Sequence, residues 1–364
     1  MITIVGAGPA GSYCAYLLAK AGKRVQVIEE HPEIGKPVQC TGIVTGEIRT
    51  VLKGINIDDA AINKIGNVRI VAPDGNHIEL KLRTPDLVLD RAKFDRLLAE
   101  KAKNEGAEYR LDTRFAGIEN DKLTLCRKNS IKKTKTDILI GADGPLSSVG
   151  RKTGLVKKRE FFFGIQARAK LKNDNAVEFY PIKKGFGWTV PENKDTVRIG
   201  VATTNNSKQA FDEFINKKIK NIKGIMEIQA GLIPVYNPKQ KTMSRRTFLV
   251  GDAAGQVKAT TAGGIVQGLI GAECLAKAIT EGKNYEQLWK KSMGKDLYVS
   301  LLMRKAMNRF SDNDYNELVK IFSKPKNREI LETESRDKML KMGIKLAVTE
   351  PGLWKYARHI LQSL

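Results

Sequence analysis

The chain has 364 residues, enough for two or three lobes around a substantial core. Its 63 lysine and arginine residues against 40 aspartate and glutamate residues give a formal net charge of +23, which favours an anionic partner such as a phosphorylated substrate or an acidic membrane surface. The lysines are scattered through every segment, so a merely lysine-rich surface is the plain alternative. No basic tract interleaved with aromatic residues appears, which disfavours nucleic acid as the partner. No apolar run reaches the roughly 18 residues that a membrane span requires.

Four cysteines, Cys14, Cys40, Cys126 and Cys274, are far apart and form neither a CxxC nor a zinc-type spacing. This usage is typical of a reducing cytoplasm, and it predicts neither a disulfide framework nor a metal site. The first apolar run starts at residue 2 without a charged segment before it, so no signal peptide is expected. We therefore expect a cytoplasmic protein that meets a membrane, if at all, from its surface.

The first thirty residues predict a strand, a glycine turn, a helix and a second strand that ends on an acid. The strands are residues 2–5 and 24–28, the turn is GAGPAG at 6–11, and the helix covers 12–20. Glu29 is the acid. This order of elements is typical of a dinucleotide-binding unit.

Each residue of this unit has a physical role. Gly6 permits the tight turn, Gly8 lets the backbone approach a pyrophosphate, and Gly11 lets the helix pack closely on the strand. The helix N-terminus supplies N–H groups to the phosphates, and Glu29 is placed to accept a ribose hydroxyl. A glycine turn without a ligand is the alternative, and the position of the acid disfavours it.

The next elements are of two kinds. Residues 31–48 contain Gly35, Pro37 and Gly42 and predict a loop. Further on we expect a hairpin over 66–84, a helix over 90–106 with Asp90 as N-cap, and strands over 108–118, 122–127 and 137–140. Period-two strands follow at 160–171, 176–180, 185–190 and 197–203, and since no helix separates them they predict an antiparallel sheet apart from the nucleotide-binding lobe.

The chain then returns to the first lobe. Residues 247–250 predict a strand, 251–255 a turn, and 263–281 a helix. Residues 285–364 read as helical, with interruptions at Pro325 and Pro351.

Three glycine-containing turns stand in order along the chain: GAGPAG at 6–11, GADGPLSSVGR at 141–151 and FLVGDAAG at 248–255. One such turn could hold NAD or FAD, whereas the three together indicate FAD. The set resembles the flavoprotein superfamily that includes the aromatic hydroxylases, and most closely the geranylgeranyl reductase family of archaeal lipid biosynthesis. The resemblance extends to about residue 280.

The elements and this resemblance together imply an α/β + β fold. A Rossmann-like FAD-binding domain is expected from residues 1–65, 85–157 and 240–282. Residues 66–84 and 158–239 are expected to form an antiparallel-sheet substrate domain, and 283–364 a helical C-terminal region.

The resemblance also implies a set of cofactor contacts. They are Gly6, Gly8, Ala10 and Gly11 on the pyrophosphate, Glu29 on the adenosine ribose, Cys40, Thr41 and Gly42 in a loop that passes the flavin, Arg91 near the phosphate or ribityl end, Phe115 on the adenine side, Asp143 in the second turn, Asp252 on the ribityl chain, and Gly263, Gly264 and Ile265 facing the pyrimidine ring. A carboxylate at Asp252 can accept ribityl hydroxyls, and N–H groups at the helix start can stabilise the negative charge of reduced flavin. A surface salt bridge for Arg91, a small loop residue at Cys40 and a turn former at Asp143 stay open as alternatives.

Residues 185–191, GFGWTVP, with Gly200 nine residues past the proline, resemble the family's YxWxFP signature followed by GxG, which lines the tunnel for the prenyl chain. Phe186, Val190 and Ala202 depart from that signature but keep the site apolar. The resemblance implies that Phe186, Trp188 and Pro191 contact substrate. A strand with a core tryptophan is the alternative, and flavin-dependent halogenases share the Trp-x-x-Pro pattern.

The predicted function is that of an FAD-dependent reductase that saturates C=C bonds of geranylgeranyl chains in archaeal-type membrane lipid precursors, with Cys40 as candidate proton donor. Its expected partners are a prenylated phospholipid substrate, NADPH or reduced ferredoxin as electron donor, and an anionic membrane surface. Two alternatives stay open: an FAD monooxygenase or halogenase that acts on an apolar or aromatic substrate, and a basic flavin-binding protein without turnover.

Overall fold

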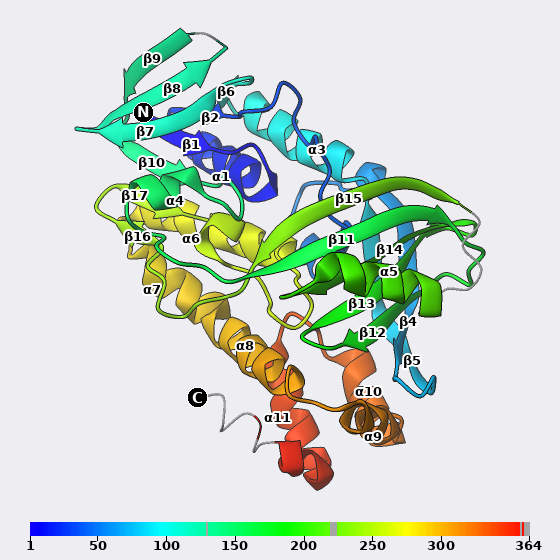
Figure 1. Ribbon diagram of the computed structural model, residues 1–364. Coiled ribbons are helices and arrows are strands. Elements are labelled where there is room, and N and C mark those ends of the chain that lie inside the picture. Colours follow the sequence, from blue (N-terminus) through cyan, green and yellow to red (C-terminus); the bar gives the residue numbers. More distant parts are fainter. Residues whose placement is uncertain (129, 219–223, 357–358, 360–364) are drawn as a thin grey trace.

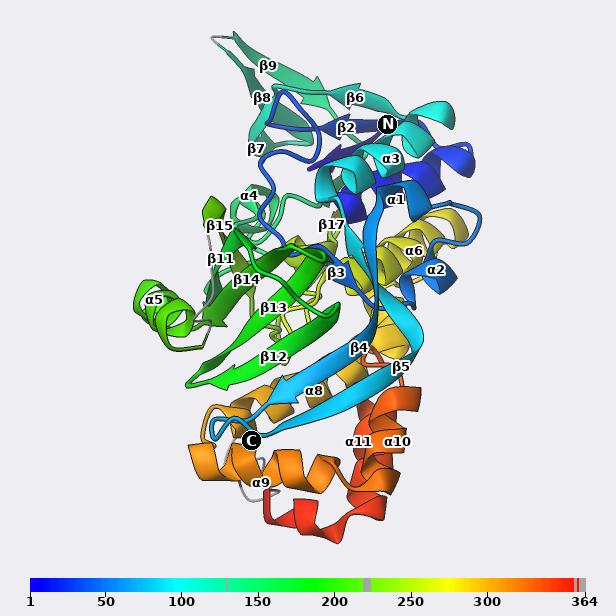
Figure 2. The ribbon, with the colours of Figure 1, turned by 90° about the vertical axis from the view of Figure 1, so that its right-hand side faces the viewer.

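The structure is a computed structural model that describes residues 1–128, 130–218, 224–356 and 359. Figure 1 shows two large sheets next to each other, with a group of helices below them. In both views a small sheet lies at the end of the molecule opposite three C-terminal helices (Figures 1 and 2). The strands of this sheet are β7 (Arg114–Glu119), β8 (Lys122–Arg127) and β9 (Ser130–Lys135), and the helices are α9 (Asp312–Phe322), α10 (Pro325–Thr333) and α11 (Met339–Thr349).

The first large sheet carries the predicted dinucleotide unit. Its six strands have the order β16-β17-β10-β1-β2-β6. Their bounds are β1 Ile2–Val5, β2 Val25–Ile28, β6 Glu108–Arg110, β10 Ile138–Gly141, β16 Met243–Ser244 and β17 Thr247–Leu249. β1 pairs in parallel with β2 and β10, and these short strands are mostly apolar because they are buried on both faces. The buried polar residues Thr3 and Gln26 pair with each other, since the Gln26 amide donates to the Thr3 hydroxyl at 2.8 Å.

Three helices cover this sheet: α1 (Pro9–Lys20), α3 (Arg91–Asn104) and α6 (Ile265–Glu281). Fully buried Leu18, Leu98 and Leu269, one from each helix, share a single core with the sheet. The predicted helices are confirmed, and the Asp90 side chain caps α3 by accepting the N–H of Lys93 at 3.0 Å.

The second large sheet has eight strands in the order β15-β11-β14-β13-β12-β4-β5-β3. Their bounds are β3 Ile43–Val44, β4 Ala61–Val71, β5 His77–Leu89, β11 Phe161–Lys170, β12 Ala176–Ile182, β13 Gly185–Asn193, β14 Thr196–Thr203 and β15 Ile225–Pro234. The hairpin is longer than the predicted 66–84 segment. The prediction of an antiparallel sheet is correct except that β12 pairs in parallel with β4, because the long connection between them crosses the first lobe.

The predicted strand over 108–118 is wrong. Asp112 has φ +54° and breaks it, so β6 joins the first sheet while β7 (Arg114–Glu119) pairs with β8 (Lys122–Arg127). β9 (Ser130–Lys135) completes this three-stranded sheet. Neither β9 nor β15 was predicted, since their sequences, SIKKTK and IMEIQAGLIP, lack a clear apolar alternation.

Helices make up most of the described part of the C-terminal region, as predicted. They are α7 (Tyr285–Trp289), a π-helical turn (Lys290–Gly294), α8 (Lys295–Met307), α9 (Asp312–Phe322), α10 (Pro325–Thr333), α11 (Met339–Thr349) and a 3₁₀ turn (Pro351–Tyr356). Pro325 and Pro351 begin helical segments, because proline fits the first helical position. Residues 357–358 and 360–364 lie outside the described residues. The short helices α2 (Ile48–Val51) and α4 (Ser148–Lys152) and the helix α5 (Ser207–Lys218), which packs on the second sheet, complete the fold.

Candidate functional site

A cavity of about 600 Å³ lies between the two large sheets. The first turn (residues 6–11), the flavin loop (residues 36–42), Asp252, the start of α6 and strands β11, β13 and β15 contribute to its wall. All the predicted site residues line this cavity except Gly11 and Pro191. A cavity of this size between two lobes is typical of a cofactor or substrate site.

The first turn packs as its glycines predict. Gly6 has φ +103°, and a Cβ there would lie 2.3 Å from the Ala142 carbonyl oxygen. A Cβ on Gly11 would lie 2.1 Å from the Gly6 carbonyl oxygen, so this residue serves the packing of α1. A Cβ on Gly8 would meet no atom within 4 Å, and Gly8 lines the cavity. The turn therefore offers bare backbone at a helix N-terminus, the surface that a pyrophosphate requires.

The Glu29 carboxylate is fixed next to this turn. Its Oε2 accepts the N–H of Ala7 at 2.8 Å, and its Oε1 accepts the N–H of His31 at 3.0 Å and lies 2.7 Å from the Nδ1 of His31. A carboxylate has about four acceptor positions, so Glu29 keeps capacity for a ribose hydroxyl.

Asp252 presents a partly buried carboxylate to the cavity. Burial raises its pKa, against the opposing charges of Arg91 and Arg159. Among the described residues none donates a hydrogen bond to this carboxylate, which is unfavourable for a charge that is largely removed from water. A Cβ on Gly264 would lie 2.9 Å from its Oδ1, so only glycine leaves room there. Hydroxyl donors from a ligand, such as those of a ribityl chain, would satisfy it.

Arg91 opens α3 and lines the cavity. Its Nε and Nη2 donate to the two oxygens of Asp95 at 3.1 and 3.0 Å. Arg91 therefore does form a salt bridge, as the alternative to cofactor binding predicted. The pair is nearly buried at the cavity wall, however, and does not lie on the outer surface. A bidentate partner holds the guanidinium in one orientation.

Asp143 and Phe115 lie on the remaining part of this wall. The Asp143 carboxylate accepts the hydroxyl of Ser147 at 2.6 Å and the N–H of Val149 at 2.9 Å, which favours its role as a turn former. Burial raises the pKa of Asp143, and these hydrogen bonds oppose the rise. Phe115 on β7 is buried with its ring in the core next to the cavity.

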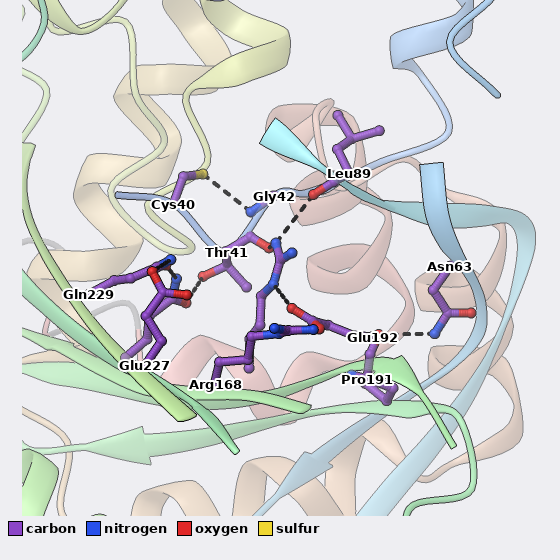
Figure 3. Close-up of polar contacts among 12 residues, drawn as sticks. Cys40, Thr41, Gly42, Asn63, Leu89, Arg168, Pro191, Glu192, Glu227 and Gln229 are labelled. Atoms are coloured by element: carbon purple, nitrogen blue, oxygen red, sulfur yellow. Dashed lines mark hydrogen bonds and ion pairs between the residues drawn. The ribbon is translucent and has the colours of Figure 1, made fainter. Parts of the chain in front are cut away.

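The flavin loop carries Cys40, whose Sγ accepts the N–H of Gly42 at 3.3 Å (Figure 3). Gly42 has φ +75°, and a Cβ there would lie 2.5 Å from the Leu89 carbonyl oxygen. The loop thus passes so close to the end of β5 that only glycine fits at this position.

A chain of polar side chains joins the same loop to the second sheet. The Thr41 hydroxyl donates to Gln166 at 2.8 Å, Gln166 to Gln229 at 2.6 Å, and Gln229 to Glu227 at 2.9 Å (Figure 3). The two glutamines line the cavity and give it a polar stretch beside Cys40. The sequence contains no signal for this chain, because the residues come together only when β11 and β15 pair.

A buried carboxylate anchors the loop from the other side. The Glu192 side chain is 4% exposed and accepts the Nε groups of Arg168 and Arg198 at 2.6 Å each. Arg198 in turn donates to the carbonyl oxygens of Thr41 and Leu89, at 2.5 and 3.2 Å. Glu192 therefore holds Arg198, and Arg198 holds the flavin loop. Figure 3 shows Glu192 and Arg168 on the side of the second sheet that faces Thr41.

The second part of the cavity is apolar. Phe186, Trp188 and Val190 alternate along β13 and face the cavity, and the rings of Phe186 and Trp188 lie 5.6 Å apart. A Cβ on Gly200 would lie 2.6 Å from the Trp188 ring, which explains the glycine of the signature. Pro191 is out of phase with this face and lies outside the cavity wall, with its carbonyl accepting from Asn63.

Four charged residues that the sequence analysis missed also line the cavity: Asp86, Lys258, Arg336 and Asp337. Arg336 and Asp337 come from the connection between α10 and α11. No local motif marks them, since charged residues between two helices are usually solvated.

The fold and this cavity define an FAD-binding flavoprotein. The family described as "FAD binding domain" matches residues 1–284, and the chain belongs to that family. Its cofactor is FAD.

The particular family follows from two relatives. The chain is 31% identical to the digeranylgeranylglycerophospholipid reductase of Methanococcus vannielii, over 99% of this chain and 98% of the relative. It is 33% identical to digeranylgeranylglycerophospholipid reductase 2 of Methanococcoides burtonii, over 87% of this chain and 86% of the relative. The chain therefore belongs to the digeranylgeranylglycerophospholipid reductase family.

Solved structures agree on the fold. A geranylgeranyl bacteriochlorophyll reductase-like protein from Thermoplasma acidophilum superimposes with a TM-score of 0.87 at 24% identity, covering 99% of this chain and 98% of that one. A flavin-dependent brominase gives a TM-score of 0.75 at 17% identity, with 98% of both chains covered. At these identities the likeness concerns the fold alone.

Proposed function

We propose that this chain is an FAD-dependent reductase that saturates C=C bonds of geranylgeranyl chains in archaeal-type membrane lipid precursors. The observation that carries the proposal is one cavity that joins the Asp252 carboxylate to the apolar face of Phe186, Trp188 and Val190. Full-length relatives named as digeranylgeranylglycerophospholipid reductases support this choice of lipid.

Different residues would serve different parts of such a reaction. FAD bound here would supply the hydride after reduction by the electron donor. The first turn, Glu29 and Asp252 suit the pyrophosphate, ribose and ribityl groups, and the start of α6 suits the pyrimidine ring. An isolated C=C bond has no carbonyl to polarise, so the apolar wall contributes by holding the chain in place and excluding water. Cys40 holds a transferable proton at Sγ on the cavity wall.

The test uses the purified holoprotein, reduced anaerobically with dithionite. On addition of digeranylgeranylglyceryl phosphate, mass spectrometry of the lipid is expected to show gains in steps of two hydrogens. An unchanged lipid mass with the flavin still reduced would contradict the proposal. Rapid oxygen consumption with conversion of an aromatic substrate would instead support a monooxygenase or halogenase.

The electron donor belongs to the same proposal. The sequence has no second GxGxxG unit, so NADPH would bind transiently, and a basic surface also suits an acidic reduced ferredoxin. The rate of anaerobic flavin reduction by each donor separates the two, and added salt should slow reduction by an acidic ferredoxin.

We also propose attachment to an anionic membrane surface. In the described part of the chain no helix is long and apolar enough to cross a membrane. The support for surface attachment is an apolar patch formed by Ile344, Val348 and Trp354, which are 56%, 77% and 67% exposed, with Lys341 and Lys345 beside it on α11. Exposed tryptophan and aliphatic residues next to lysines are typical of helices that lie at a membrane interface.

A further inference from the structure

Two ion pairs form what we call the charged cluster: Lys258 with Asp337, and Arg336 with Asp86. The side chains of Lys258 and Asp337 are 6% and 7% exposed. All four residues line the cavity. Their charges balance, and of the four side chains only that of Arg336, at 24%, is substantially exposed. Nearly buried charges beside an apolar chain site are costly unless they serve a purpose.

Lys258 lies against the turn that begins α6. A Cβ on Gly263 would lie 3.0 Å from the Cε of Lys258 and 3.5 Å from its Nζ, and the Lys258 N–H donates to the Gly263 carbonyl at 3.0 Å. The neighbouring Gly264 approaches the Asp252 carboxylate. One short turn thus has the ammonium group on one side and the proposed ribityl acid on the other.

The helical C-terminal region fixes the loop that carries Lys258. Arg304 on α8 donates to the carbonyl oxygens of Ala259 and Thr260, and the Ser300 hydroxyl accepts the N–H of Thr260 at 3.0 Å. These contacts set the backbone of residues 258–260 relative to the turn at Gly263.

Asp337 fixes the ammonium group itself. Its carboxylate accepts from Lys258, from the Thr45 hydroxyl and from Gln267, the last at 2.8 Å. Burial raises the pKa of Asp337, but Lys258 and these hydrogen bonds outweigh that effect and lower it to about 2. Asp337 is therefore ionised at neutral pH.

We propose that the positive charge of Lys258 helps to set the FAD reduction potential. In this proposal Asp337 is a positioning residue, which holds the Lys258 ammonium group in place and offsets part of its charge at this end of the cavity. The inference rests on the proposed placement of the pyrimidine ring beside Gly263, Gly264 and Ile265. A positive charge in a low-dielectric cavity favours reduced flavin, which carries negative charge, and a carboxylate on the same ammonium offsets part of this effect.

The proposal predicts shifts of opposite sign, measured by spectroscopic redox titration of the FAD-loaded protein without lipid. Lys258→Met should lower the potential, and Asp337→Asn should raise it. We expect each substitution to change the equilibrium constant between oxidised and reduced FAD at least tenfold. For a two-electron couple this corresponds to a shift of about 30 mV in the reduction potential. The uncharged double variant Lys258→Met/Asp337→Asn should return close to the wild-type value.

Three controls separate charge from structure. Lys258→Arg and Asp337→Glu keep both charges and should keep the potential within threefold in the same equilibrium. Glu334→Gln removes another nearly buried carboxylate of the helical region, one that pairs with Lys341 and Lys345 and does not line the cavity, and it should also leave the potential unchanged.

Single variants that both stay within threefold of wild type, or that shift in the same direction, would overturn the proposal. If Lys258→Met or Asp337→Asn no longer binds FAD, the remaining variants test the proposal. A tenfold shift in the double variant, in Lys258→Arg or in Asp337→Glu would also overturn the proposal. The experiment needs only a wild-type protein that binds FAD. Its failure is therefore distinct from failure of the reductase proposal, which lipid mass spectrometry tests separately.

Discussion

At the scale of single residues, three carboxylates of the site accept hydrogen bonds from the protein, whereas a fourth does not. Glu29, Asp95 and Asp143 all accept hydrogen bonds from neighbouring residues. Asp252 is partly buried at the cavity wall, and its carboxylate accepts none from the described residues. This difference supports the prediction that Asp252 binds a ligand, a prediction that was possible from the sequence because the Gly251-Asp252-Ala253 motif is local.

Asp252→Asn should weaken FAD binding roughly 10- to 100-fold, the loss expected for a charge-assisted hydrogen bond. Fluorescence titration of the apoprotein with FAD measures this loss. Asp143→Asn is the matched control, and it should change the affinity less than threefold because the protein already occupies the Asp143 carboxylate. Equal losses in the two variants would contradict the assignment.

The same Asp252 substitution should stabilise the apoprotein, and by more at pH 7 than at pH 4. Burial raises the pKa of Asp252 above its ordinary value of 3.8, so the folded chain retains a proton that the unfolded chain has lost. Stability of the wild type therefore falls as pH rises from about 4 through the folded pKa, and the asparagine variant lacks this loss. Thermal unfolding of both apoproteins at the two pH values is the measurement, and an equal gain at both would argue against the buried charge.

Cys40→Ala tests the proton donor. If Cys40 donates the proton, turnover with the lipid should fall roughly 100-fold, as for loss of a general acid, while FAD affinity stays within threefold. Cys40→Ser controls for the hydrogen bond from the Gly42 N–H, which a hydroxyl oxygen can also accept. Unchanged turnover in the alanine variant would remove Cys40 from the mechanism.

At the scale of elements, the flavin loop takes its position from the second sheet. Glu192 on β13 holds Arg198 on β14, and Arg198 binds the backbone of Thr41 and Leu89. The loop itself was predictable from its glycines and proline. Its anchors were not, because Glu192 and Arg198 resemble ordinary polar residues of alternating strands until the sheet forms.

Glu192→Ala should lower the free energy of unfolding by about 3–5 kcal/mol, because it leaves the nearly buried Arg198 without a carboxylate. Urea unfolding measures the change. As a control, Glu79→Ala removes a half-exposed carboxylate that pairs with Arg69. This substitution should lower the free energy of unfolding by less than about 1 kcal/mol. A loss of similar size in both variants would mean that Glu192 does not anchor the loop.

Helices and strands were predicted correctly where a local sequence pattern defines them. The prediction failed where an element depends on pairing with a strand that is distant in the sequence. The strand–turn–helix unit at the start, α3 and α6 all follow from short motifs and caps. The split of 108–118 into β6 and β7 depends on which sheet each half joins, and β15 depends on its neighbour β11. Such choices are made by tertiary contacts, which override local preference.

At the scale of the whole molecule, the helical C-terminal region belongs to the site although it lies beyond the three glycine turns. Arg304 ties α8 to the loop at Ala259 and to the β13 residue Gly185, and Asp337 reaches Lys258. The sequence predicted the helices but not these contacts, since they join positions that are 40 or more residues apart. The same region carries the exposed patch of Ile344, Val348 and Trp354.

The patch and the net charge of +23 predict salt-dependent attachment to membranes. The protein should sediment with vesicles that contain anionic lipid at low salt and much less at high salt, since each basic residue near the surface contributes about 1 kcal/mol. Val348→Ser/Trp354→Ser should reduce binding at least tenfold. Ile131→Ser, at an equally exposed position on β9, should not, and equal sedimentation with neutral vesicles would contradict the prediction.

The central claim is that one cavity brings FAD and a prenyl chain together for reduction of the chain. A single turnover under strict exclusion of oxygen tests it most directly, with flavin absorbance and lipid mass followed in the same sample. We predict that reduced flavin is reoxidised only after lipid is added, with one flavin oxidised for every two hydrogens gained by the lipid. Flavin that stays reduced in the presence of the lipid and reoxidises only when oxygen is admitted would contradict the account.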